Sequence, residues 1–206
     1  MHDPNSTAVR LARAQLSLEG LSIGDALGQC FFSPWIRDYC LSKRIVPEGP
    51  WRWTDDTAMA LGIVEVLERH HRIDQDELAS IFAQRYVNDP DRGYGPAQHD
   101  LLRAIHRGRS WQAKTHELFN GAGSFGNGGA MRASPVGAYF ADDMSQVVEQ
   151  AGLSAEVTHS HPDGQAGAIA VAVAAAWAWK WCETGRAAHR TDLLRTALDL
   201  TPRGAN

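Results

Sequence analysis

Apolar residues recur at three- and four-residue steps along much of the chain, as Leu61, Val64 and Leu67 illustrate. This spacing places them on one face of an α-helix. Runs that alternate apolar and polar β-branched residues between turns, as half-buried strands do, are absent. The pattern predicts an all-α protein.

Helices are predicted where this spacing meets capping residues. They cover residues 8–21, Thr54 to about 70, Asp76 as N-cap to 87, a short segment around 101–105, and about 144–157, 164–182 and 191–200. Gly20, Gly24 and Gly28 are expected to interrupt the first helical region with turns or close backbone contacts. Residues 31–52, rich in proline and aromatic side chains, predict a long irregular loop.

Composition narrows the class of protein. With 44% apolar and 21% charged residues in 206, the chain has ordinary globular usage and enough length to bury a core. Its net charge of −4 and scattered basic residues argue against nucleic-acid binding. No linker or repeat divides it, so residues 1–206 are expected to form one domain.

Cysteine usage and hydropathy favour a cytoplasmic protein that does not enter membranes. Cys30, Cys40 and Cys182 are odd in number and lack C-x-x-C spacing, which argues against a disulfide framework and a zinc knuckle. The first residues lack the apolar core of an export signal. The most apolar stretch, Ala166–Trp181, is shorter than the roughly 20 residues that span a bilayer, so it predicts a buried core helix.

Thr54-Asp55-Asp56-Thr57 stands directly before a helical pattern and has two interpretations. Threonine is a common N-cap, and acids favour the positive end of the helix dipole, so the segment can be purely structural. A hydroxyl and two carboxylates are also hard ligands for magnesium, manganese or calcium. Because successive helical side chains diverge, such an ion would have to lie ahead of the first turn, with further oxygens completing its shell.

Two later segments add candidate ligand contacts. Gly121–Gly129 holds five glycines in nine residues, which suits backbone amides turned toward phosphates or, more simply, turns and close helix crossings. His159 and His161 flank Ser160 at a helix boundary, where either could contact a ligand, carry a proton or cap the helix. A zinc site is disfavoured, because no third ligand stands at a zinc spacing.

Four ordered motifs together resemble the ADP-ribosylglycohydrolase family over roughly Leu16–Ala175. They read Gly20-Leu21-Ser22-Ile23-Gly24-Asp25-Ala26-Leu27-Gly28, Trp53-Thr54-Asp55-Asp56-Thr57, Gly123-Ser124-Phe125-Gly126-Asn127-Gly128-Gly129-Ala130-Met131-Arg132 and Thr158-His159-Ser160-His161-Pro162. The resemblance implies an orthogonal helical bundle with two magnesium ions, or manganese in their place, over an ADP-ribose cleft. The implied reaction hydrolyses the bond at the anomeric carbon of ADP-ribose, releasing it from a protein side chain or small conjugate.

The resemblance also implies roles for individual residues. Thr54, Asp55 and Asp56 match the amino-terminal half of the metal site, and either carboxylate could assist the attacking water. The substrate-binding residues it implies are Ser124, Phe125, Gly126, Asn127 and His159. Asp25 matches the acid of the first motif and is assigned a supporting role.

The sequence departs from the family pattern in two places. The second metal motif, of the form Asp-x-Asp-Thr, is absent, and no Asp-x-Asp follows His161, so the domain is expected to be incomplete at its carboxyl end. Gln29 stands where many members carry a glutamate, although Glu48 could reach the cleft. The alternative function is therefore an inactive member that binds ADP-ribose or serves structurally, as crystallin-like relatives do. The acceptor and the oligomeric state stay open.

Overall fold

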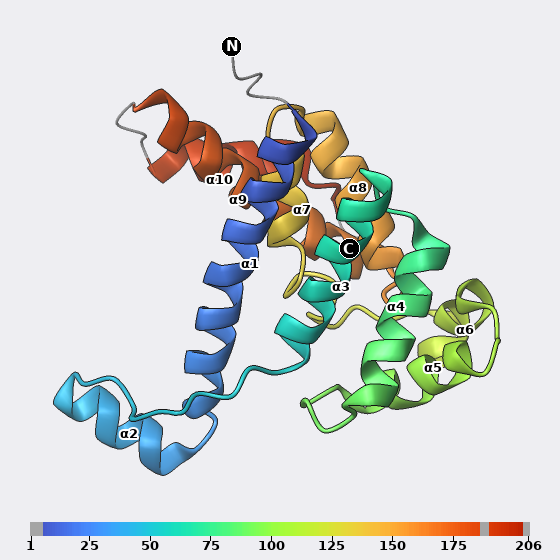
Figure 1. The fold of residues 1–206 in the computed structure, drawn as a ribbon, viewed down its shortest axis with the longest axis horizontal. Helices are drawn as coiled ribbons and strands as arrows, with labels where there is room; N and C mark the ends of the chain where they lie inside the picture. Colours follow the sequence, from blue (N-terminus) through green and yellow to red (C-terminus); the bar gives the residue numbers. More distant parts are fainter. Residues whose placement is uncertain (1–5, 186–189, 204–206) are drawn as a thin grey trace.

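The computed structural model describes residues 6–185 and 190–203, and this part of the chain contains ten α-helices, one short 3-10 helix and no strand (Figure 1). The predicted all-α class is confirmed. The helices are α1 (Thr7–Cys30), α2 (Pro34–Lys43), α3 (Asp55–His70), α4 (Gln75–Asn88), α5 (Pro96–His106), α6 (Trp111–Glu117), η1 (Leu118–Gly121), α7 (Ser134–Tyr139), α8 (Met144–Glu156), α9 (Pro162–Thr184) and α10 (Arg190–Leu200).

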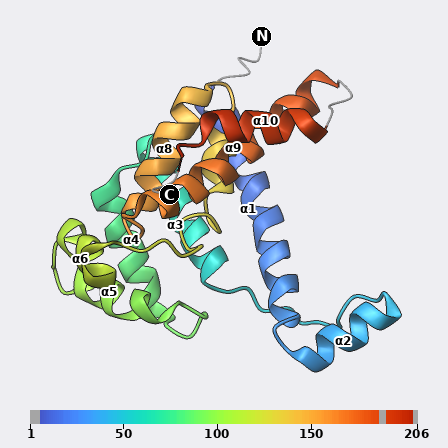
Figure 2. The same ribbon diagram turned by 180° about the vertical axis from the view of Figure 1, so that it is seen from behind.

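The core lies where α3, α7, α8 and α9 meet. Helix α7 packs against both α1 and α9, and α3 packs against α1 and α4. Helices α4, α5 and α6 lie on the side of α3 that is opposite to α1 (Figure 1). Helix α2 projects from the carboxyl end of α1 in both views (Figures 1 and 2). The amino-terminal end of α3 thus faces the space between α1 and the α4–α5 connection.

Capping side chains define the starts of α3 and α4, one at the predicted residue and one at a different residue. Thr54 caps α3 by accepting a hydrogen bond from the Asp56 amide, so the predicted start near Thr54 is confirmed. Asp74, rather than the predicted Asp76, caps α4. Asp76 instead accepts a hydrogen bond of 2.7 Å from the Trp111 indole, a long-range contact that local capping patterns do not reveal.

Two predictions about the amino-terminal third are wrong. Helix α1 continues unbroken through Gly20, Gly24 and Gly28, because each glycine faces open space and nothing forces a turn there. Residues 31–52 are not wholly irregular, since α2 occupies ten of them and begins with Pro34 at a first-turn position that suits proline.

Helix α9 forms the wall of the core that its apolar composition predicts. Ala168, Ala172, Val173 and Ala176 are buried along one face. Among the described helices, none is both long enough and apolar enough to cross a membrane. The three cysteines are free, as their number and spacing predicted.

Candidate functional site

Asp25, near the carboxyl end of α1, anchors the first turn of α3. One carboxylate oxygen accepts hydrogen bonds from the Thr54 amide at 2.7 Å and from the Thr57 amide and hydroxyl at 3.2 and 2.6 Å. The other accepts from the Thr54 hydroxyl at 2.6 Å. Because Thr57 is almost fully buried, this single carboxylate satisfies donors that water does not reach.

Asp25→Ala is expected to lower the free energy of unfolding by about 2 kcal/mol, because two hydroxyls and two amides lose a charged acceptor. Urea unfolding followed by circular dichroism measures the change. Asp25→Asn, which keeps one acceptor oxygen, should lose less. Equal stability of the alanine and asparagine variants would contradict this anchoring role.

The carboxylates of Asp55 and Asp56 are half-buried beside this anchor. Burial raises the pKa of Asp55 to about 6, with the negative charges of Asp56 and Asp25 contributing further. Burial also raises the pKa of Asp56, and the negative charge of Asp25 raises it further. In the described part of the chain neither carboxylate forms an ion pair with a basic side chain. The two groups therefore form an uncompensated negative site.

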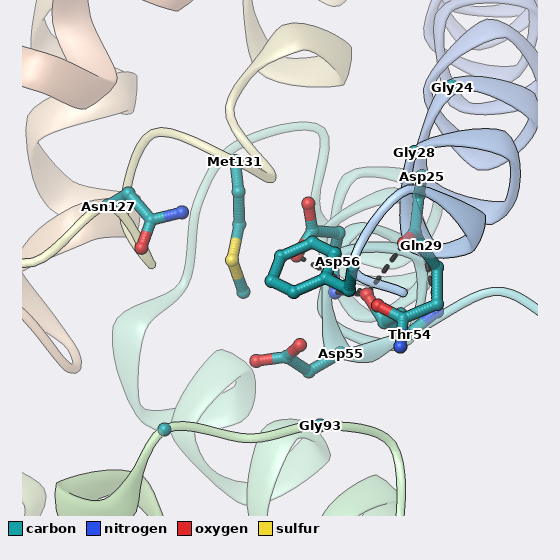
Figure 3. A pocket seen from close by; sticks show the side chains of 12 residues that line it. Gly24, Asp25, Gly28, Gln29, Thr54, Asp55, Asp56, Gly93, Asn127 and Met131 are labelled. Carbon is teal, nitrogen blue, oxygen red and sulfur yellow. Dashed lines mark hydrogen bonds between the residues drawn. The ribbon is translucent and has the colours of Figure 1, made fainter. Parts of the chain in front are cut away.

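A first cavity of about 580 Å³ opens directly onto these groups. It is lined by Gly24, Asp25, Gly28, Gln29, Phe32, Thr54, Asp55, Asp56, Gly93, Gly95, Asn127 and Met131. In Figure 3 the Met131 side chain lies between Asn127 and the two carboxylates. The α3 motif and the glycine-rich segment, more than 60 residues apart, thus meet at one cavity.

The connection between α4 and α5 forms the third wall of this cavity. The Arg92 carbonyl accepts a hydrogen bond from the Asp55 amide at 2.7 Å. The Arg92 guanidinium stacks 3.5 Å from the Trp53 ring centre and donates to the Trp53 carbonyl. A side chain at Gly93, where φ is +88°, would stand 3.7 Å from an Asp55 carboxylate oxygen. The loop therefore fixes the backbone on which Asp55 sits.

Small residues let the glycine-rich segment lie directly on the segment that carries the histidines. A Cβ at Gly123, where φ is +77°, would lie 2.3 Å from the Ser160 hydroxyl, and one at Gly164 would lie 2.7 Å from the Ser124 carbonyl. Within the loop, the Ser124 hydroxyl accepts a hydrogen bond from the Gly126 amide at 3.3 Å. This contact brings Ser124, Gly126 and Asn127 beside His159.

A second cavity of about 380 Å³ lies between these two segments. Its lining includes Ser124, Gly126, Asn127 and His159, four of the five residues that the family resemblance assigns to the substrate. It shares Asp55, Gly95, Asn127 and Met131 with the first cavity. The acidic site and the glycine loop therefore line two adjacent cavities with a common wall.

Phe125, the fifth such residue, does not line the second cavity. This residue is 62% exposed, and its ring centre lies 6.1 Å from that of Phe119 and 5.4 Å from that of His161. Phe119 does line the cavity and is also exposed. The pair presents an open aromatic surface at the edge of the cavity, which suits a planar heterocycle.

Several lining residues were not predicted from the sequence. Gly93 and Gly95 belong to none of the motifs named from the sequence, although the positive φ of Gly93 explains the glycine there. Arg132 and Met131 were quoted only as part of a motif, and no local pattern indicates that Arg132 is fully buried at the cavity wall.

The possible metal ligands are Thr54, Asp55 and Asp56, all at the start of α3. Within the described ranges no group of three or more histidine, cysteine, aspartate or glutamate side chains is arranged to hold a metal ion. The three side chains supply oxygen donors only, the set that magnesium prefers, and leave about half of a six-oxygen shell to other groups. The residues present fit one side of such a site.

Comparison with known proteins identifies the family. The model of the ADP-ribosylglycohydrolase family matches residues 6–205. The chain belongs to this family. The ADP-ribosylglycohydrolase relatives include the ADP-ribosylhydrolase ARH3 of Xenopus tropicalis, 32% identical over 177 residues, which are 79% of this chain and 49% of that protein.

Other relatives match over a shorter part of the chain or at lower identity. The ARH3 of Homo sapiens is 39% identical over 119 residues, 57% of this chain and 32% of that protein. The ADP-ribosylarginine hydrolase Tri1 of Pseudomonas putida is 28% identical over 163 residues, 73% of this chain and 42% of that protein. The matched part of the chain thus covers a third to a half of the length of these relatives.

Proposed function

We propose that this chain provides the ADP-ribose pocket and one side of a magnesium centre in a hydrolase that cleaves the glycosidic bond at the anomeric carbon of ADP-ribose. One observation carries the proposal. The acidic cavity at the start of α3 and the cavity under the glycine loop share Asp55, Asn127 and Met131. A ligand in the second cavity therefore borders Asp55, which also lines the first.

The glycine loop and His159 suit the pyrophosphate and ribose of such a ligand. Glycines allow backbone amides to approach phosphate oxygens closely. His159 adds a ring nitrogen at the same wall, and the exposed Phe119 ring offers a stacking surface for the adenine at the outer edge. With the adenine at the outer edge and the pyrophosphate at the glycine loop, the ribose that carries the cleaved bond lies toward Asp55.

Magnesium fits the first cavity, and manganese has the same preference for oxygen donors. Thr54, Asp55 and Asp56 would hold the ion from one side. The Thr54 hydroxyl donates its proton to Asp25 and accepts from the Asp56 amide, which leaves one lone pair available to an ion. When bound, the ion supplies Lewis-acid stabilisation of charge and a fixed position for the ribose hydroxyls.

The reaction adds water across the bond between the anomeric carbon and the acceptor atom. The hydroxyl remains on the ribose, and the acceptor leaves with a proton. Asp55 lines both cavities, whereas Asp56 lines only the first, so Asp55 is the carboxylate placed to accept the proton of the attacking water. The partner is accordingly an ADP-ribosylated protein or a small ADP-ribose conjugate.

Calorimetry with ADP-ribose, with and without magnesium chloride, tests binding, and chromatographic detection of ADP-ribose released from modified arginine and serine peptides tests hydrolysis. We expect magnesium to strengthen binding. Absence of binding at millimolar ADP-ribose, with or without the metal, would reject the proposal.

Phe119→Ala is expected to weaken ADP-ribose binding about tenfold, because stacking of one base on an aromatic ring contributes roughly 1–3 kcal/mol. The same calorimetric titration measures the loss. Trp35→Ala, on the projecting α2 and 89% exposed, is the matched control and should leave the affinity unchanged. Equal affinities of the Phe119→Ala variant and the unsubstituted protein would contradict the stacking role.

An ADP-ribose-binding protein without hydrolase activity is the second candidate. Gln29, whose amide cannot act as a base, lines the first cavity, and this observation favours it. This alternative predicts a normal calorimetric titration with no release of ADP-ribose from any conjugate. Release that depends on magnesium would exclude it.

A further inference from the structure

A chain of hydrogen bonds runs behind the second cavity from Arg132 through Thr158 to His159. Arg132 and Thr158 are fully buried, and His159 is 3% exposed. One Arg132 nitrogen donates to the Ser154 carbonyl at 3.0 Å and to the Thr158 hydroxyl at 2.7 Å. The same hydroxyl lies 2.7 Å from His159 Nδ1.

The donors and acceptors of this chain fix its proton positions. A guanidinium only donates, so the Thr158 oxygen accepts from Arg132. The hydroxyl proton of Thr158 then needs an acceptor, and His159 Nδ1 is the acceptor within reach among the described residues. The opposite arrangement, with a proton on Nδ1, would leave a buried hydroxyl proton without a partner, at a cost of about 1–3 kcal/mol.

The other ring nitrogen of His159 opens onto the cavity. A Cβ at Gly128 would lie 2.9 Å from Nε2, and one at Gly126 would lie 3.6 Å from it. Within the described part of the chain Nε2 has no hydrogen-bond partner, so a proton on it is available to a ligand. Glycine at positions 126 and 128 keeps this approach free.

We propose that Arg132 and Thr158 are positioning residues that hold His159 as a neutral imidazole with its proton on Nε2, directed at an acceptor oxygen of the ligand. His159 would then present an uncharged N–H donor, which suits a phosphate, hydroxyl or carbonyl oxygen of the ligand. Identifying that ligand as ADP-ribose rests on the proposed function, whereas the tautomer does not.

The charged groups around His159 support a neutral ring. Arg132 lies behind it, and Asp55 from α3 lines the same cavity. At the start of α9, His161 accepts a hydrogen bond from the Asp163 amide and lies 3.7 Å from the Asp163 carboxylate. Burial, then the positive charge of Arg132, lowers the pKa of His159 to about 3. His159 should therefore stay neutral where an ordinary histidine titrates.

Nitrogen-15 NMR of the ligand-free protein tests the tautomer directly, with the His159 signals assigned by their loss in His159→Gln. We expect a protonated Nε2 and an unprotonated Nδ1 from about pH 5 to 8. A proton on Nδ1, or a ring that becomes charged in this range, would overturn the proposal. This measurement needs no ligand and no destabilised variant, so it is independent of the proposed function.

Two substitutions test the positioning role. Thr158→Val removes the hydroxyl at nearly constant volume and should yield mixed tautomers and about tenfold weaker ADP-ribose binding, the loss expected for one hydrogen bond. Thr158→Ser keeps the hydroxyl and should restore both readouts. An unchanged tautomer in folded Thr158→Val would reject the role of Thr158. If Thr158→Val does not fold, a Thr158→Ser variant with altered His159 signals would reject it instead.

Discussion

Gly137→Ala is expected to lower the free energy of unfolding by at least about 3 kcal/mol, or to prevent folding altogether. Gly137 lies in α7, the short helix between α1 and α9. A Cβ there would stand 1.9 Å from the Ala172 carbonyl oxygen and 2.6 Å from its carbonyl carbon. Both are backbone atoms in the interior of α9, so no side-chain rotation relieves the overlap. Guanidinium unfolding followed by circular dichroism measures the loss.

Gly20→Ala is the matched control, because it makes the same chemical change inside another helix. Nothing lies within 4 Å of a Cβ at Gly20. Alanine is the better helix former by about 1 kcal/mol, so this variant should be as stable as the unsubstituted protein or slightly more so. A Gly137→Ala variant as stable as Gly20→Ala would show that α7 and α9 are not packed this closely.

The same two glycines show where sequence reasoning about the fold reaches its limit. Helical periodicity correctly predicted α3, α8 and α9, because one apolar face of each is buried against its neighbours. Glycine has low helix propensity, which suggested a break at Gly20, although α1 is continuous. Whether a glycine interrupts a helix or admits a neighbouring backbone is decided by tertiary packing, which neither propensity nor spacing specifies.

The candidate site divides in the same way. The local sequence predicted that Thr54 caps α3 and that Asp55 and Asp56 lie in its first turn, since capping depends on residues close in sequence. Asp25 accepts four hydrogen bonds from Thr54 and Thr57, which are 29 and 32 residues away, and no local pattern in the sequence indicates them. Arg132 was equally hidden, because its partners Ser154 and Thr158 lie on a different segment.

Asp55→Asn is expected to make the metal-free protein more stable at pH 7 while weakening magnesium binding at least about tenfold. Burial and the neighbouring carboxylates raise the pKa of Asp55 to about 6 from an ordinary value of 3.8. The folded state thus binds the Asp55 proton more tightly than the unfolded state. Stability therefore falls as pH rises from about 4 to about 6, and the full cost is present at pH 7.

Asparagine removes that cost without changing the size of the side chain. Allowing for solvent screening of a half-buried carboxylate, we expect a gain of about 1–2 kcal/mol in the free energy of unfolding. Urea unfolding in the presence of a chelator measures this gain, and repeating it at pH 4 should show most of the difference gone. Calorimetric titration with magnesium chloride measures the loss of affinity.

Opposite changes in stability and metal affinity distinguish a binding site from a helix cap. If Asp55 only favoured the positive end of the α3 dipole, Asp55→Asn would lower stability at pH 7 by about 0.3–1 kcal/mol and leave magnesium binding unchanged. Asp100→Asn, an exposed carboxylate in α5, controls for the loss of one negative charge and should change neither quantity. A gain in stability together with a loss of magnesium affinity would therefore assign Asp55 to metal binding.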